Sequence, residues 1–228
     1  MLKKLCEVYK IAINEQQATF LEEFVRNLVE APFNLTGIRE LRSALLKHVI
    51  EVLLPLINEN LEGYVIDVGT GGGVPAVPIS VYYGEKVKVW ALESIEKKAR
   101  FLNTVAEKLK LSITVLNTRA EEAGKEKYRE KFDAAFSRAL GILPVALELM
   151  APFVKVGGKI YIYGGRTSED ETTKINTALK ELSLSLERIK PYTIEGKDLR
   201  LLVFRKYEPT PEAYPRRFSV IKKKPLKD

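Results

Sequence analysis

The stretch from Val65 to Pro75 constrains the fold most, because an apolar run ends there in an acid and a glycine-rich turn follows at once. Glycine has no Cβ and tolerates positive φ, so such a turn lets the backbone come close to a ligand. The segment after the turn presents the free N–H groups of a helix start. A strand, a glycine turn and a helix in this order predict a cofactor site at the end of a strand.

Segments with the pattern of strands alternate with helical segments from Tyr64 onward. We predict strands at 64–68, 87–92, 112–117, 132–137, 159–163, 184–190 and 200–206, and helical or mixed segments near 76–83, 95–110, 120–128, 140–154 and 168–182. This alternation predicts an α/β fold with a seven-stranded, mostly parallel sheet and helices on both faces. The last two strands lack a helix between them, so we expect the last strand to be reversed.

The first 60 residues predict a helical lobe. Asn14 and Gln17 have the spacing of a capping box, and apolar residues follow at helical spacing until Pro32. A second apolar-periodic helix is expected at about 41–56. We therefore divide the chain into an N-terminal helical lobe (1–60), a cofactor-binding domain (61–207) and a basic C-terminal tail (208–228).

Composition limits the class of protein. No apolar run approaches the roughly 18–20 residues that a membrane span needs. The single cysteine, Cys6, cannot form an internal disulfide and excludes a cysteine zinc cluster. We expect a cytoplasmic protein without a metal site, since a lone cysteine fits a reducing compartment.

The net charge of +7 is concentrated at the end of the chain. Residues 216–228 carry six basic side chains and one acid, which leaves only +2 for the other 215 residues. Such a segment is either a solvated terminus or an arm that binds nucleic-acid phosphates. The candidate RNA-binding residues are Arg216, Arg217, Lys222, Lys223 and Lys224.

Two acids bear on the identity of the cofactor. Gly71, Gly73 and Ala76 satisfy the dinucleotide pattern GxGxxG/A, which is a weak signal alone. Asp67 at the strand end would repel a pyrophosphate and favour the ammonium and sulfonium groups of S-adenosylmethionine. Glu93 ends the next strand, where it could accept both ribose hydroxyls of either cofactor or be a simple surface glutamate. Since a second substrate domain for NAD is lacking, S-adenosylmethionine is the predicted cofactor.

Short motifs in order along nearly the whole chain extend this prediction. The sequence resembles the RsmG family, also called glucose-inhibited division protein B, the guanine-N7 methyltransferases of small-subunit ribosomal RNA. The segments that match are Asn34-Leu35-Thr36 with His48, Asp67 to Pro75, Leu92 to Leu102, Arg119 to Glu122, Ser137-Arg138-Ala139, and Tyr214 to Arg217 with the lysines before Pro225. The chain departs from many members at Glu51-Val52, where they have Asp-Ser, and at Gly164-Gly165, where they have Lys-Gly, with Arg166 next.

The resemblance implies a class I (Rossmann-like) methyltransferase fold and methylation of 16S rRNA, at guanine 527 of the 530 loop. It assigns Ala120 and Glu121 to the adenine end of the cofactor. The predicted cofactor-binding residues are then Asp67, Gly69, Gly71, Gly73, Val74, Glu93, Ala120, Glu121 and Arg138.

The residues agree with N7 chemistry. Guanine N7 already holds an in-plane lone pair, so no general base is required and positioning dominates. Cytosine-C5 methylation needs a cysteine nucleophile, but Cys6 lies far from the fourth strand. The loop after that strand lacks the Asn/Asp-Pro-Pro-aromatic motif of adenine-N6 enzymes. Arg138 there, and Arg119 after the third strand, are the candidate catalytic residues, with surface salt bridges as the alternative.

Two other functions remain open from the sequence. One is a non-catalytic RNA-binding factor in ribosome assembly that keeps a methyltransferase-like fold. The other is a small-molecule methyltransferase or an NAD-linked enzyme, which leaves the basic tail unexplained. His48 is expected to be a packed or hydrogen-bonded structural histidine. The expected partner is 16S rRNA or the small ribosomal subunit, and the expected state is a monomer.

Overall fold

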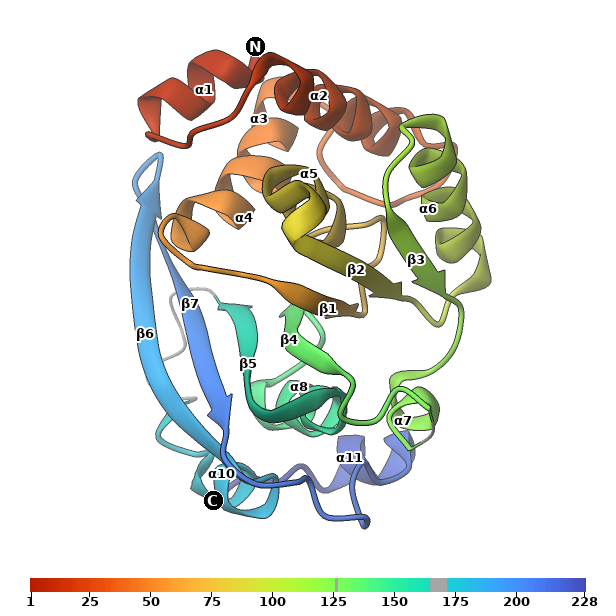
Figure 1. Ribbon diagram of the computed structural model, residues 1–228, viewed down its shortest axis with the longest axis vertical. Helices are drawn as coiled ribbons and strands as arrows, with labels where there is room; N and C mark the ends of the chain where they lie inside the picture. Colours follow the sequence, from red (N-terminus) through yellow and green to blue (C-terminus); the bar gives the residue numbers. More distant parts are fainter. Residues whose placement is uncertain (126, 165–171) are drawn as a thin grey trace.

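A twisted sheet organises the computed structural model, which describes residues 1–125, 127–164 and 172–228 (Figure 1). The strands in this part of the chain run in the order β3-β2-β1-β4-β5-β7-β6. Their bounds are β1 (Gly63–Val68), β2 (Val87–Leu92), β3 (Ile113–Leu116), β4 (Phe132–Arg138), β5 (Val154–Gly164), β6 (Leu184–Ile194) and β7 (Lys197–Lys206). Strands β1 to β5 pair in parallel, while β7 is antiparallel to both β5 and β6. The predicted reversed last strand is confirmed.

Helices cover both faces of the sheet (Figure 1). One group comprises α1 (Leu2–Val8), α2 (Glu15–Glu30), α3 (Leu41–Leu45), a π turn (Leu46–Ile50), α4 (Glu51–Leu53), α5 (Ala76–Tyr83) and α6 (Glu96–Lys108). The other comprises α7 (Ala120–Ala123), α8 (Leu143–Met150), α10 (Asn176–Glu181) and α11 (Phe218–Lys223). Short 3₁₀ turns follow α4, α5 and α8, at Leu54–Leu56, Gly84–Lys86 and Ala151–Phe153.

The capping box that opens α2 is present as predicted. Asn14 Oδ1 accepts from the Gln17 amide at 2.8 Å, and the Gln17 side chain accepts from the Asn14 amide at 2.9 Å. These two bonds satisfy N–H groups that have no partner within a helix. The second predicted helix, near 41–56, is interrupted by the π turn.

Two core clusters lie on opposite faces of the sheet because side chains alternate along each strand. Val65 contributes to the cluster with the N-terminal helices, whereas Ile66 and Val68 contribute to the cluster with α7, α8 and α11. The N-terminal cluster also contains Leu201 and Val203 of β7. The helical lobe and the sheet therefore share one hydrophobic core.

A buried acid ties the lobe to the antiparallel edge of the sheet. The carboxylate of Glu59 accepts from Arg188 at 2.9 and 2.8 Å and from Lys190 at 2.8 Å, both on β6. The hydroxyl of Tyr161 on β5 donates to the same carboxylate at 3.2 Å. These contacts join residues more than 100 positions apart in the sequence.

Several predicted boundaries differ from the structure. Strand β6 continues to Ile194 instead of 190, and β7 begins at Lys197 instead of 200. Strand β5 begins at Val154 instead of 159 and continues through Gly157 and Gly158. A Cβ at Gly158 would lie 2.7 Å from the Asp133 carbonyl oxygen, so only glycine allows β5 to pass there. The predicted helix at 120–128 covers only Ala120–Ala123. Part of the predicted helix 168–182 lies outside the described residues, and within the rest α10 spans Asn176–Glu181.

The segment after β7 packs against the domain. Ile221 in α11 is fully buried in the second core cluster. The guanidinium of Arg129 donates to the carbonyls of Gly124, Thr210, Pro211 and Tyr214. At the end of the chain, the Asp228 carboxylate accepts from the backbone amides of Asn176 and Thr177. Residues 208–228 are thus held against α7, α8 and α10.

Candidate active site

The predicted glycine turn follows β1 and is fastened to the end of β2. The amides of Gly69 and Thr70 both donate to the Leu92 carbonyl, at 2.9 and 3.0 Å. Gly71 has φ +60°, and a Cβ added there would meet no atom within 4 Å, so the turn opens toward free space at this residue. Gly73 has φ +101°, and a Cβ would lie 2.7 Å from Leu102. The turn therefore presents backbone to an open site on one side and packs on α6 on the other.

Asp67, near the end of β1, is buried below this turn with 1% of its surface exposed. Its Oδ2 accepts from the Ala76 amide at 3.0 Å, while its Oδ1 has no hydrogen-bond partner among the described residues. Burial raises the pKa of Asp67 to about 7, while the neighbouring Thr70 side chain and then the bond from Ala76 act in the opposite direction. A buried acceptor without a partner fits a ligand that brings a cationic or N–H donor.

Glu93 follows β2 and is buried, which excludes a simple surface glutamate. Its Oε2 accepts from the Gly71 amide at 2.9 Å, and its Oε1 accepts from the Ile95 amide at 2.8 Å. Each carboxylate oxygen has two lone pairs, so each keeps one for a further donor such as a hydroxyl. Glu93 therefore holds the glycine turn in place and still offers two acceptors.

The predicted residues after β3 lie next to the C-terminal segment. Arg119 Nε donates to Glu121 Oε1 at 2.5 Å, and the guanidinium lies 5.0 Å from the ring centre of Phe218 in α11. Ala120 begins α7 and is buried. Asn117 binds the Glu93 carbonyl at 2.8 Å through its side-chain amide. The bond from Asn117 holds the ends of β2 and β3 together beside the glycine turn.

Arg138 ends β4 and links the sheet to the helical lobe. Its Nη1 donates to the Lys47 carbonyl at 2.6 Å, and its Nη2 donates to His48 Nδ1 at 3.0 Å. Because arginine only donates, His48 Nδ1 is the acceptor and Nε2 carries the proton. His48 Nε2 then donates to Thr36 Oγ1 at 2.9 Å. Arg138 does not form the surface salt bridge that was its alternative role, because its own side chain is only 19% exposed.

His48 lies in the π turn, so the altered helical pitch places its ring beside Arg138. Burial, and then the positive charges of Arg138 and Lys47, lower the pKa of His48 to about 3. The expectation of a hydrogen-bonded histidine inside the fold is confirmed. The ring is neutral at physiological pH and fixes the position of the guanidinium.

The His48 ring makes the stability of the protein depend on pH. The pKa in the fold is below the unfolded value of about 6.5, so the unfolded chain alone binds the proton as pH falls. From pH 7.5 to 5.5 we expect the wild type to lose about 1.4 kcal/mol of unfolding free energy relative to His48→Gln. Urea unfolding at the two pH values measures this difference. Parallel pH profiles of the two proteins would contradict it.

The comparison with His48→Gln is needed because the titration of Asp67 changes the stability of the protein with pH in the opposite direction. The pKa of Asp67 in the fold is raised. Its contribution to folding stability is therefore complete below about pH 4 and is lost as pH rises toward 7. Both proteins retain Asp67, and His48 is the only histidine in the chain. The difference between the two slopes therefore reports His48.

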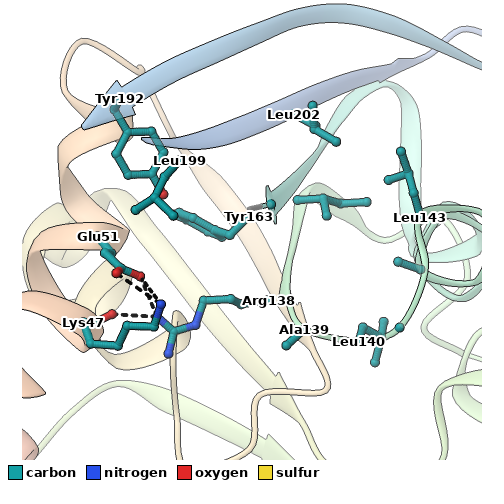
Figure 2. Close-up of a pocket in the computed structure, with 14 residues that line it drawn as sticks. Lys47, Glu51, Arg138, Ala139, Leu140, Leu143, Tyr163, Tyr192, Leu199 and Leu202 are labelled. Carbon is teal, nitrogen blue, oxygen red and sulfur yellow. Dashed lines mark hydrogen bonds and ion pairs between the residues drawn. The ribbon is translucent and has the colours of Figure 1, made fainter. Parts of the chain in front are cut away.

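A pocket of about 300 Å³ opens beside Arg138, at the ends of β4 and β5 (Figure 2). Lys47 and Glu51 of the helical lobe form one part of its wall, and Tyr192 and Leu199 of the antiparallel strands form another. Gly164, where many relatives were expected to have lysine, also lines it, while Gly165 and Arg166 lie outside the described residues. The sequence did not single out Lys47 or the tyrosine.

Arg216 of the predicted RNA-binding set is bound to a buried acid. Its Nε and Nη2 donate to the two carboxylate oxygens of Glu148 at 2.8 and 2.6 Å, and its backbone amide donates at 3.0 Å. Glu148 lies in α8 and is fully buried. In contrast, four cations of the set are exposed around α11: Arg217, Lys222, Lys223 and Lys224.

Metal-binding and membrane-spanning features do not occur in residues 1–125, 127–164 and 172–228. No group of three or more His, Cys, Asp and Glu side chains in these ranges could hold a metal ion. Within the same ranges, every helix is too short or too polar to cross a bilayer.

Several known proteins are similar to this chain in sequence or in structure. The family of rRNA small subunit methyltransferase G matches residues 14–199. The ribosomal RNA small subunit methyltransferase G of Thermotoga petrophila is 40% identical over 227 residues, which cover 99% of this chain and 98% of that protein. That of Fervidobacterium nodosum is 38% identical over 214 residues, 93% of this chain and all of that protein.

A solved structure shares the fold at low identity. The tRNA (m1A58) methyltransferase of Aquifex aeolicus matches with a TM-score of 0.52 and 18% sequence identity. The match covers 82% of this chain and 76% of the Aquifex aeolicus chain. The class I methyltransferase fold is therefore confirmed, together with the family resemblance found in the motifs. The chain belongs to the rRNA small subunit methyltransferase G family.

Proposed function

We propose that this methyltransferase transfers a methyl group from S-adenosylmethionine to N7 of a guanine in 16S rRNA, guanine 527 by the family resemblance. The observation that carries the proposal is the connection of two sites through Arg138. On one side lies the glycine turn with the unpartnered Asp67 oxygen, and on the other lies the pocket beside β4 and β5. One site suits a cationic cofactor and the other has room for a base.

The cofactor is held by residues that follow the first three parallel strands. Asp67 accepts from its ammonium group, and the Gly69–Val74 turn, including Gly71 and Gly73, lies along it. Glu93 accepts from the ribose hydroxyls, and the Ala120–Glu121 backbone lies beside the adenine. When bound, S-adenosylmethionine supplies an electrophilic methyl group on a sulfonium.

The residues present suffice for N7 chemistry. Guanine N7 attacks the methyl carbon with its ring lone pair as the carbon–sulfur bond breaks, and that bond pair stays on sulfur. The positive charge moves to the purine, and no proton leaves in this step. The protein must therefore orient the base and exclude water, and Arg138, fixed by the Lys47 carbonyl and His48, is the group that does so at the junction of both sites.

The exposed cations around α11 are the proposed contacts to rRNA phosphates. Arg217, Lys222, Lys223 and Lys224 extend from a helix whose own position is fixed by Ile221. Arg216 takes part by anchoring the segment through Glu148. Arg119, placed between Glu121 and Phe218, joins the cofactor site to this surface.

The affinity for S-adenosylmethionine is expected to rise about tenfold from pH 5.5 to 7. The cationic ligand requires an ionised Asp67, whose pKa without ligand is about 7, so binding below that pH must release a proton. Titration calorimetry across this range measures the affinity and the proton release. Asp67→Asn should bind weakly without this pH dependence, whereas Asp198→Asn, at an exposed aspartate on β7, should behave as the wild type. An unchanged slope in Asp67→Asn would contradict the role.

We further propose that the protein works as a monomer in the cytoplasm, on 16S rRNA or on the small subunit. The buried, unpaired thiol of Cys6 supports a reducing compartment. Mass mapping of modified nucleosides in 16S rRNA from cells with and without the protein tests the reaction. Loss of one 7-methylguanosine is expected. Unchanged rRNA together with no S-adenosylmethionine binding would instead favour the non-catalytic assembly factor.

A further inference from the structure

The carboxylate of Glu51 faces the pocket beside Arg138 (Figure 2). It lies in α4, directly after the π turn, and its side chain is 10% exposed. Lys47 Nζ lies 3.1 Å from Oε1 and 2.8 Å from Oε2, and Arg138 Nη1 lies 3.9 Å from Oε2. A carboxylate has about four acceptor positions, so these contacts leave acceptor capacity directed at the pocket.

We propose that Glu51 selects guanine by accepting hydrogen bonds from N1–H and the N2 amino group of the target base. This inference rests on the proposed function, and it adds the residue that reads the base. Guanine is the base whose Watson–Crick edge presents two adjacent donors, which match the two oxygens of a carboxylate. Adenine presents the N1 lone pair at the same edge, so a carboxylate repels it. Pyrimidines have no N7.

The position of Glu51 also gives the base the required orientation. In guanine the N1–H and amino group lie on the side of the ring away from N7. Arg138 Nη1 lies 3.9 Å from the Glu51 carboxylate, and Asp67 of β1 pairs in register with Phe136 of β4, two residues before Arg138. Arg138 is therefore near both the pocket acid and the cofactor acid. A base whose donors contact Glu51 turns its N7 edge toward the cofactor site.

The same contact grows stronger as the reaction proceeds. Methylation at N7 makes the purine cationic, and this charge makes N1–H a stronger donor. A carboxylate that accepts from N1–H then binds the charged product-like ring better than neutral guanine. Tyr192 and Leu199 supply a flat, largely apolar wall at the other part of the pocket, which suits the face of the base (Figure 2). Glu51 is thus inferred to affect both the choice of base and the rate.

Inosine provides a test, because it keeps N7, O6 and N1–H but lacks the N2 amino group. Reconstituted small subunits carry either guanine or inosine at the position that the wild type methylates, and single-turnover rates are measured with saturating S-adenosylmethionine. For the wild type we expect the inosine substrate to react about tenfold or more slowly. For Glu51→Ala we expect a lower rate on guanine and a difference between the two substrates of less than about twofold. Glu195→Gln, at a half-exposed glutamate paired with Arg42, should keep the wild-type ratio.

Glu51→Gln is the second variant, should removal of the side chain disturb the fold. Its amide has one acceptor oxygen, so the ratio of rates should fall between those of the wild type and Glu51→Ala. Calorimetry with S-adenosylmethionine and thermal unfolding confirm that each variant keeps its cofactor site and fold. A wild-type guanine-to-inosine ratio retained in both Glu51 variants overturns the role of Glu51 and leaves the proposed function intact. Absence of any methylated base with the wild type overturns both.

Discussion

Replacing Arg138 by alanine is expected to lower the rate of methyl transfer by at least about 100-fold, because positioning is the main task of the protein in N7 methylation. The guanidinium lies between the cofactor site and the base pocket, fixed by the Lys47 carbonyl and His48. Single-turnover methylation of 16S rRNA in small subunits measures the change. Arg138→Lys should not restore the rate, since an ammonium cannot make both of these planar contacts.

The Arg138 variants also have a cost in stability. Removal of the guanidinium leaves the Lys47 carbonyl and His48 Nδ1 without their donor in a mostly buried place, while Glu51 keeps its ion pair with Lys47. An unsatisfied buried acceptor typically costs about 1–3 kcal/mol. Rates must therefore be compared at a temperature where each variant is folded. Arg100→Ala, at an exposed arginine on α6, is the matched control and should change neither quantity. A folded Arg138→Ala with a rate within a few-fold of the wild type would contradict the assignment.

Replacing Glu148 by glutamine is expected to lower the free energy of unfolding by about 3 kcal/mol and to release the C-terminal segment. The carboxylate is fully buried and accepts three hydrogen bonds from Arg216. A neutral amide at this place leaves the Arg216 guanidinium, whose side chain is 24% exposed, without its counter-charge and loses an acceptor. Urea unfolding measures the first effect. Increased proteolysis after β7 measures the second.

A quadruple alanine variant separates anchoring from contact with RNA. Its changes are Arg217→Ala, Lys222→Ala, Lys223→Ala and Lys224→Ala, all at exposed cations. We expect its stability to equal that of the wild type, while the salt dependence of RNA binding, as the slope of log K against log salt, falls by up to about 3. Glu148→Gln should weaken both stability and RNA binding. An unchanged slope in the quadruple variant would show that these cations do not touch phosphates.

Local patterns predicted much of the fold because they depend on near neighbours in sequence. The capping box at Asn14 and the glycine turn after β1 need only a few residues each, and both are present. The absence of a helix between β6 and β7 correctly predicted antiparallel pairing. Strand β5 was predicted to begin five residues too late, because the close approach of the Asp133 backbone to Gly158 joins residues that are distant in sequence.

The sequence predicted the parts of the candidate site that lie on a single strand or turn, but not the contacts between these parts. Arg138 could be placed at the end of a strand, but its contact with His48 joins residues 90 positions apart and no periodicity reveals it. Glu51 follows His48 by three residues, which places both on one helical face, and this spacing was the available signal. The sequence also held a signal for Glu148, because it is the one acid in the apolar segment Leu143–Met150. A lone acid in such a segment indicates a buried pair with a cation such as Arg216.

The contacts of Glu59 bear on how the protein is made. A chain grows from its N-terminus, so the residues of the helical lobe are synthesised long before β6 supplies Arg188 and Lys190 to this acid. Until then the lobe lacks the β7 side chains that complete its core, Leu201 and Val203. We therefore infer that the lobe reaches its final structure late in translation, and that its apolar surface is open to aggregation or chaperones before that time.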